Sequence, residues 1–287
     1  MNTAAIVISF AAAFHFALGQ VLTQFGLRHV SPLSGAAISI PTFTLVFICA
    51  SPILLRNETI VWSAVPIFMA VGLAFPAVVT LLTFASNRAL GPVVTSSLGN
   101  LSPLFAVTLA VVLLHEPLRP LQFAGLVVVV AGVLAISVQR YGAKDWRTWA
   151  LLLPLGAAAL RGLVPPVIKL GLDLWPSPIA AGLVGYIMST VTVVTVEKIR
   201  NGSFIAKASR TGRLWFMGIG LCNGLATMLL YAALGAGPVS LVVPLIATFP
   251  LFTVVLSVIA FGRLENGFRL AGGTVLTVAG VVLILIG

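Results

Sequence analysis

The chain has 287 residues, of which 60% are hydrophobic and only 8% are charged, and its formal net charge is +10. Soluble globular domains contain about a quarter charged residues. This composition therefore excludes a soluble protein and predicts an integral membrane protein. A basic chain can bind nucleic acid, but here the cations lie in short connections between apolar segments, so we expect no nucleic-acid partner.

Ten apolar segments of the chain are long enough to be membrane-spanning helices. They cover residues 4–25, 35–55, 62–84, 90–113, 121–138, 149–171, 178–196, 214–234, 238–261 and 268–286. A helix crosses a hydrocarbon core about 30 Å thick with roughly 20 residues, and lipid offers no partner to a free backbone group, so each segment is expected to be helical. The first segment lacks a basic leading region and is interpreted as a span, not as a signal peptide. Cys49 and Cys222 lie inside apolar segments, and we predict neither a metal site nor a cofactor.

The basic residues are divided unevenly between the two sides of this arrangement. Assigning the connections alternately places twelve cations on one side, namely Arg28, Arg88, Arg140, Lys144, Arg147, Lys198, Arg200, Lys207, Arg210, Arg213, Arg263 and Arg269. The other side receives only Arg56, Arg119 and Lys169. Cytoplasmic loops carry the excess of Lys and Arg, so the twelve-cation side is predicted to be cytoplasmic and to contact anionic membrane lipids. We expect a bacterial inner-membrane location with both termini outside the cytoplasm.

The two halves of the sequence resemble each other in matched order. Residues 14–27 (FHFALGQVLTQFGL) align with residues 160–172 (LRGLVPPVIKLGL) with one gap, and three later pairs follow: Gly91-Pro92-Val93 with Gly237-Pro238-Val239, Pro103-Leu104-Phe105 with Pro250-Leu251-Phe252, and Glu116 with Glu265. Each half contains five segments, so the second half must enter the membrane in the opposite orientation, as in carriers built from inverted repeats.

The predicted fold is therefore an all-α integral membrane protein with ten transmembrane helices. Two inverted five-helix repeats, residues 1–139 and 149–287, are expected to surround a central cavity, and residues 140–148 are expected to form a cytoplasmic linker between them.

Two runs of the sequence resemble a known transporter domain. Residues 91–133 (GPVVTSSLGNLSPLFAVTLAVVLLHEPLRPLQFAGLVVVVAGV) and their weaker copy at residues 237–281 are similar to the end of an EamA domain of the drug/metabolite transporter superfamily. Residues 160–172 resemble the start of such a domain, in which a tryptophan commonly stands at the position of Arg161 and a lysine at that of Lys169. The resemblance implies a ten-helix, basket-like carrier with a central cavity that exports a small metabolite, but it implies no particular substrate.

Arg161 lies near the middle of the segment 149–171. An arginine at that depth costs roughly 2.5–3.5 kcal/mol on insertion scales, and its side chain is too short to reach either interface. It is expected either to line a wet cavity and bind a substrate anion, or to be a structural residue that bonds carbonyls freed by Pro165 and Pro166. His15 aligns with Arg161 and is expected either to line the cavity as well or to form a hydrogen bond between helices. Because histidine titrates near neutrality, it is the candidate site for a coupled proton.

Further polar residues within the apolar segments are candidates for the same site. Asn100 and Asn223 lie near the centres of their segments and are expected either to bond across helices or to contact substrate. Lys169, two turns beyond Arg161, is expected either to pair with Asp173 or to guide and gate substrate.

Prolines and acidic residues recur at matched places in the two halves. Pro103 and Pro250 should each bend a helix, giving either kinked packing alone or broken backbone that lines the cavity. Glu116 and Glu265 follow the bent helices and are expected to cap helix ends.

The acidic residues decide the class of substrate. All six lie in loops or at segment ends, whereas an exporter of lipophilic cations needs a carboxylate within the membrane. The predicted function is a secondary active transporter, an exporter, that moves a small anionic or zwitterionic metabolite such as an amino acid or organic acid by alternating access, without enzymatic activity. One alternative is a drug or neutral-metabolite exporter in which Arg161 is structural. The other is a membrane enzyme that acts on lipid-linked substrates, which would need a cluster of acids, histidines or metal ligands at one interface, whereas the three histidines of this chain are scattered.

Overall fold

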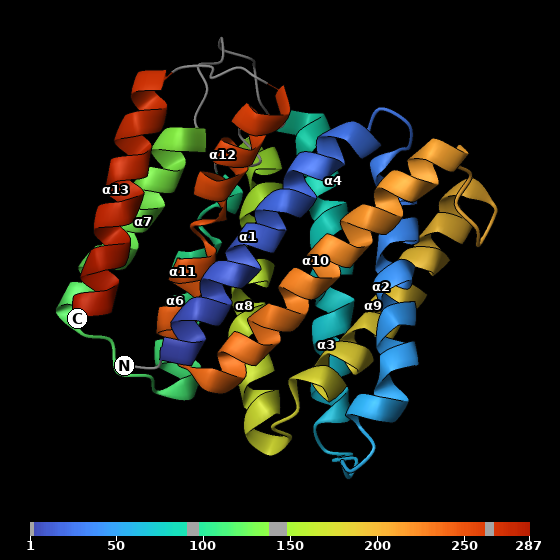
Figure 1. Cartoon of the computed structure of the whole chain (residues 1–287), viewed down its shortest axis with the longest axis horizontal. Helices are drawn as coiled ribbons and strands as arrows, with labels where there is room; N and C mark the ends of the chain where they lie inside the picture. The colour runs from blue at the N-terminus through green and yellow to red at the C-terminus, as the bar shows by residue number, and fades with distance from the viewer. Residues whose placement is uncertain (1–2, 91–97, 138–147, 262–266) are drawn as a thin grey trace.

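The computed structural model describes residues 3–90, 98–137, 148–261 and 267–287, and these residues form helices without any strand (Figure 1). The helices are α1 (Thr3–Gly26), α2 (Pro32–Leu54), α3 (Val65–Gly72), the π-helical turn η1 (Leu73–Val78), α4 (Val79–Leu90), α6 (Ser102–Leu114), α7 (Pro120–Ser137), the 3₁₀ turn η2 (Thr148–Leu151), α8 (Leu152–Leu174), α9 (Pro178–Asn201), α10 (Arg210–Ala236), α11 (Val239–Ile246), α12 (Phe249–Phe261) and α13 (Gly267–Ile286).

The helices coincide with the predicted apolar segments, and the expected all-helical membrane fold is confirmed. Within the described ranges, six helical stretches are long and apolar enough to cross a membrane: Thr3–Gly26, Pro32–Leu54, Trp149–Leu174, Pro178–Asn201, Arg210–Ala236 and Val239–Ala260. Shorter apolar helices, Val65–Val78, Ser102–Leu114, Pro120–Ala135 and Val275–Ile286, lie in the other predicted segments. The total of ten crossings stays a prediction.

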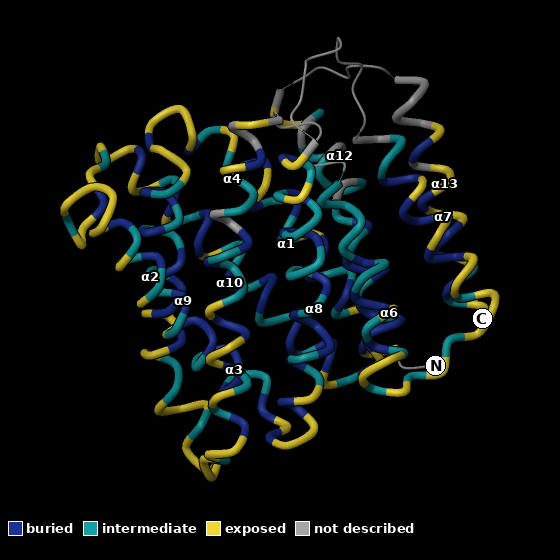
Figure 2. Tube along the Cα trace, turned by 180° about the vertical axis from the view of Figure 1, so that it is seen from behind, coloured by how far each residue is buried: buried dark blue, intermediate teal, exposed yellow. Residues whose placement is uncertain are grey.

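Large aliphatic side chains cover the outside of the bundle. Leu45, Leu214 and Ile259 are 61%, 61% and 76% exposed, and Figure 2 shows exposed residues along the outer faces of the helices as well as in the loops. An apolar surface of this extent is unfavourable in water. It is the surface expected of helices that face lipid.

Helices at equivalent places in the two halves make equivalent contacts with the other half and with their own. In the first half, α1 packs against α10 and against α11 and α12; correspondingly, α8 of the second half packs against α3 and α4 and against α6. The helices α2 and α9 pack against each other, as do α7 and α13. In Figure 1, α1 runs away from the end that carries both termini, whereas α8 runs toward that end.

The largest buried apolar cluster closes the end of the bundle that carries the termini. It includes Phe68 near the start of α3, Ile168 and Leu172 near the end of α8, Leu234 near the end of α10, and Val242 in α11. These side chains are at most 3% exposed. The cluster packs helices of both halves of the chain together.

Polar contacts at this closed end join the two halves. The carboxylate of Glu116 accepts hydrogen bonds from the backbone N–H groups of Val239, at 2.7 Å, and Ser240, at 2.9 Å. Glu116 therefore caps the start of α11, as predicted for a helix cap, although the capped helix belongs to the other half. The carboxylate of Glu58 accepts from the indole N–H of Trp175 at 3.1 Å and from the hydroxyl of Ser177 at 2.8 Å. Glu265 lies outside the described residues.

Candidate functional site

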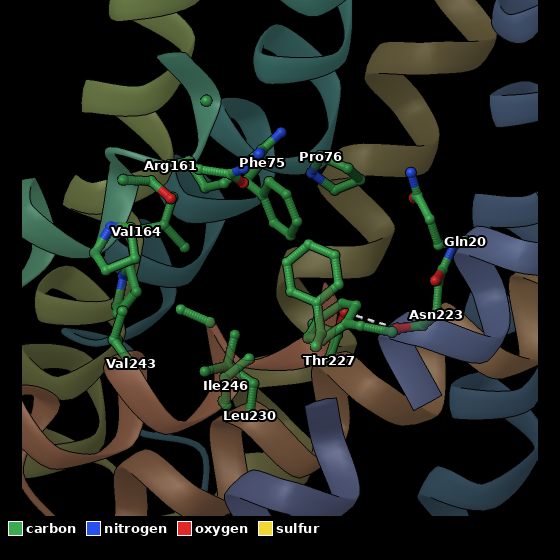
Figure 3. Close-up of a pocket in the computed structure, with 18 of the residues that line it drawn as sticks. Gln20, Phe75, Pro76, Arg161, Val164, Asn223, Thr227, Leu230, Val243 and Ile246 are labelled. Atoms are coloured by element: carbon green, nitrogen blue, oxygen red, sulfur yellow. Dashed lines mark hydrogen bonds between the residues drawn. The ribbon is translucent and has the colours of Figure 1, made fainter. Parts of the chain in front are cut away.

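A cavity of about 420 Å³ lies between the two halves (Figure 3). The first half contributes residues that include Phe16, Gln20, Phe75, Pro76, Asn100 and Pro103, and the second half contributes residues that include Arg161, Tyr186, Asn223, Thr227, Val243 and Ile246. Pockets for small molecules have volumes of about 300–1,000 Å³, so this cavity can enclose a small metabolite.

Three helix breaks surround the cavity. One lies at Asn100 and Leu101, just before α6, and a second at Ala247 and Thr248, between α11 and α12. The structure places Pro103 in the first turn of α6 and Pro250 as the second residue of α12, so each expected proline begins a new helix after a break. Proline has no N–H to continue the preceding helix. The side chain of Pro250 is outside the description of the structure.

The third break, at Phe75 and Pro76, was not predicted. The backbone of Phe75 is extended within η1, and both residues line the cavity. The hydroxyl of Ser189, in α9, donates a hydrogen bond to the carbonyl oxygen of Gly72 at 2.7 Å and lies 3.3 Å from that of Phe75. A regular helix would direct the N–H of residue 76 at the Gly72 carbonyl, and proline cannot supply it.

Arg161 lies on the cavity wall formed by α8, where Val164 and Pro165 follow it on the same face. Its guanidinium reaches toward the break before α6: a Cβ atom on Gly99 would lie 3.8 Å from Nη1 of Arg161. Among the described residues, no carboxylate lies within 4 Å of the guanidinium and no group accepts a hydrogen bond from it. Pro165 and Pro166 are buried within the continuous helix α8. Among the described residues, the backbone carbonyls near these prolines accept no hydrogen bond from Arg161.

The opposite wall carries neutral polar groups. Tyr186 donates its hydroxyl hydrogen to Oγ1 of Thr227 at 3.3 Å, and Thr227 donates to the carbonyl oxygen of Asn223 at 2.8 Å. The side chain of Asn223 fills the space beside Gly19, where glycine leaves room for it. In the view of Figure 3, Gln20 and Asn223 lie next to each other, across the pocket from Arg161.

The structure does not bring His15 to this cavity. Its Nδ1 atom lies 2.9 Å from the carbonyl oxygen of Ala11, one turn earlier in α1, and its ring packs edge-on against Phe14 at 5.5 Å. The cavity face of α1 carries Phe16 and Gln20 instead. Successive residues of a helix are about 100° apart, so a shift of one residue is enough to turn the side chain away.

Lys169 lies near the closed end and not in the cavity. Its Nζ atom donates to the carbonyl oxygen of Leu234 in α10 at 2.9 Å and lies 3.9 Å from the carboxylate of Asp173. The structure thus shows the local pair that the sequence spacing suggested, together with a bond to a neighbouring helix.

The sequence profile of the EamA-like transporter family matches residues 3–138 and 148–286. The chain belongs to the EamA-like transporter family. The two matched segments correspond to the two predicted repeats, so this EamA-like transporter contains two copies of the domain. The family is one of membrane transporters, and the apolar helices agree that the chain is an integral membrane protein.

Solved structures support the fold of this EamA-like transporter. The crystal structure of another protein is similar over 99% of this chain and 97% of its own, with a TM-score of 0.82 and 19% sequence identity. At that identity the likeness concerns the fold alone. No curated protein matches the sequence.

Sequence reasoning missed several residues that line the cavity of this EamA-like transporter. Gln20, Tyr186 and Thr227 are all polar residues within predicted spans, and Pro76 interrupts an apolar segment. Gln20 lies one turn from Phe16 on the same face of α1, and this face lines the cavity. The alignment of His15 with Arg161 pointed to a different face of the helix.

Proposed function

We propose that this EamA-like protein is a secondary carrier that exports a small organic anion or zwitterion across the bacterial inner membrane, with the acidic group of the substrate bound by Arg161. The observation that carries the proposal is a membrane-embedded arginine that lines a cavity and, among the described residues, has no partner. A charge at this depth is costly unless it faces water or an opposite charge. The planar guanidinium binds carboxylate and phosphate groups through two parallel hydrogen bonds.

We further propose that transport proceeds by alternating access of two inverted repeats. The helix contacts that are exchanged between the halves, and the opposite directions of α1 and α8 in Figure 1, support this mechanism. The buried cluster around Phe68 and Leu234 closes the end with the termini, while Gln20 on the cavity wall is exposed. The structure then corresponds to the state in which the cavity opens toward the basic end.

The basic end is proposed to face the cytoplasm. Among the described cations, Arg28, Lys198, Lys207 and Arg213 lie in or beside the connections at the end opposite the termini (Figure 1). Cytoplasmic loops carry this excess of positive charge. Substrate would therefore enter from the cytoplasm, and both termini would lie outside it.

Replacing Arg161 by Gln tests the proposal. Glutamine keeps hydrogen-bonding groups but removes the fixed charge, so binding of an organic anion should weaken by about tenfold to a hundredfold. Purified protein in proteoliposomes would be assayed for flux of a panel of carboxylates and phosphate esters, with and without a pH gradient. Arg200→Gln, which removes an exposed arginine at the end of α9, is the matched control.

Normal anion transport by the Arg161→Gln variant would contradict the anion site. It would favour the alternative in which Arg161 is structural and the substrate is a drug or a neutral metabolite. A variant that fails to fold would lead to the same conclusion, which size-exclusion chromatography of the purified protein would detect.

A further inference from the structure

The described residues that line the cavity carry a single formal charge, and this limits the charge of the molecule that the cavity can enclose. Among the described residues that line it, Arg161 is the one ionised side chain, and there is no aspartate or glutamate. The other polar side chains are hydroxyls and carboxamides: Gln20, Ser39, Asn100, Ser102, Asn223 and Thr227, with the phenol of Tyr186. We propose that the substrate is a monoanion with a neutral opposite end, and that zwitterions and dianions are discriminated against. This inference rests on the proposed anion carrier.

The proposal follows from the net charge of the loaded cavity. A monoanion bound to Arg161 gives a net charge of zero. A zwitterion leaves a charge of +1, a dianion leaves −1 and a cation gives +2. Apolar side chains such as Val129, Val164 and Ile246 form much of the wall, so an uncompensated charge is poorly solvated once the cavity closes around the substrate. The monoanion is therefore the form most readily occluded and carried across.

On the wall opposite Arg161, the residues that the structure describes provide no counter-charge for an ammonium group. Tyr186 and Thr227 direct their hydroxyl hydrogens along the chain that ends at the carbonyl oxygen of Asn223. The carboxamides of Gln20 and Asn223 each offer both a donor and an acceptor. Groups of this kind match a neutral hydroxyl or amide, whereas an ammonium group requires ionised or several converging acceptors to replace its hydration.

The apolar part of the cavity lining suits an apolar or aromatic body. Phe16, Phe75 and Phe249 line the cavity together with aliphatic side chains. Aromatic rings pair favourably in edge-on or offset arrangements. The expected ligand thus has an acidic group at Arg161, an apolar body between these phenylalanines, and either nothing or a neutral polar group near Gln20 and Asn223.

Four probes with the same phenylethyl skeleton separate the effect of charge from that of shape. 3-Phenylpropanoate is a monoanion, phenylalanine adds an ammonium group, benzylmalonate adds a second carboxylate at the same carbon, and phenethylamine carries only the ammonium group. Their binding to the purified full chain in lipid nanodiscs would be measured by calorimetry near pH 7.5. We expect 3-phenylpropanoate to bind about tenfold or more tightly than each of the other three.

A carboxylate added opposite Arg161 should change this preference. Asn223→Asp keeps the side-chain shape and supplies a counter-charge, so phenylalanine should gain affinity relative to 3-phenylpropanoate. Gln20→Glu is a second variant on the same wall, from a different helix and at an exposed position, which tests the same point if Asn223→Asp does not fold. Asn57→Asp makes the identical chemical change in an exposed loop and should leave the ratio unchanged.

The outcomes distinguish this inference from the proposed function. If phenylalanine binds the native protein as tightly as 3-phenylpropanoate and both lose affinity in Arg161→Gln, the anion site stands and the charge rule is overturned. If 3-phenylpropanoate binds with the same affinity in the native protein and in Arg161→Gln, the anion site itself is wrong. Loss of the preference for the monoanion in both wall variants, but not in Asn57→Asp, is the result expected from the charge rule.

Discussion

Ser189→Ala is expected to destabilise the protein through the helix break at Phe75 and Pro76. The hydroxyl of Ser189, whose residue is 1% exposed, donates to the carbonyl oxygen of Gly72 at 2.7 Å. Alanine removes this donor from a backbone that already lacks the N–H of Pro76, and lipid cannot replace it. Interhelical hydrogen bonds in membranes contribute about 0.6 kcal/mol on average and about 1.7 kcal/mol at most. Because this donor is fully buried, we expect a loss of about 1–2 kcal/mol in the free energy of unfolding.

Unfolding in mixed micelles, followed by tryptophan fluorescence, would measure this difference. The matched control is Thr192→Ala in the same helix. Its hydroxyl donates to the carbonyl oxygen of Met188, one turn earlier, at 2.8 Å. Such a bond within one helix contributes little, because that carbonyl also accepts the backbone N–H of Thr192. Equal stability of the two variants would show that packing alone holds the break, and that the interhelical bond is dispensable.

Three more outcomes are expected. Gly280→Ala should lower the free energy of unfolding by about 1–3 kcal/mol, because the new Cβ atom would lie 2.7 Å from the carbonyl oxygen of Gly125 in the facing helix α7. Gly218→Ala, whose new Cβ atom meets nothing within 4 Å, should have no such effect in the same unfolding measurement. His15→Gln should leave substrate affinity in a binding assay unchanged, because the ring lies off the cavity; if His15 carries the coupled proton, the variant will also flatten the pH dependence of transport near neutrality. A reporter fused after Gly287 should be inactive when it requires the cytoplasm, and cytoplasmic activity would contradict the orientation drawn from the cations.

The sequence predicted the parts of the structure that depend on composition and local pattern. Apolar segments gave the helices because lipid leaves the backbone no other partner. Arg161 was identifiable because a charge within such a segment requires an explanation, and the structure places it on the cavity wall. Pro103 and Pro250 predicted where two helices are interrupted, since proline removes a backbone donor.

The features that the sequence did not predict depend on the exact rotation of a helix or on contacts between distant segments. His15 was expected on the cavity face of α1, which Phe16 and Gln20 occupy instead; successive residues of a helix are about 100° apart, so an error of one residue in the expected position is enough to miss that face. The capping role of Glu116 was predictable, whereas its partner, the start of α11 in the other half, was not. The bond from Ser189 to Gly72 likewise joins residues that are far apart in the chain.

The pair of helices α7 and α13 forms one side of the cavity. These two helices contact each other far more extensively than they contact the rest of the described chain, and Gly125 and Gly280 bring their backbones close together. One side of α7 presents Val129, Val130 and Val133 to the cavity. The pair lies on the flank of the bundle (Figure 1), and its backbone makes few contacts with the other described helices. We therefore expect a bulkier molecule to be accommodated by outward displacement of α7 and α13 together, so that the upper limit on substrate width depends on how far this pair can move.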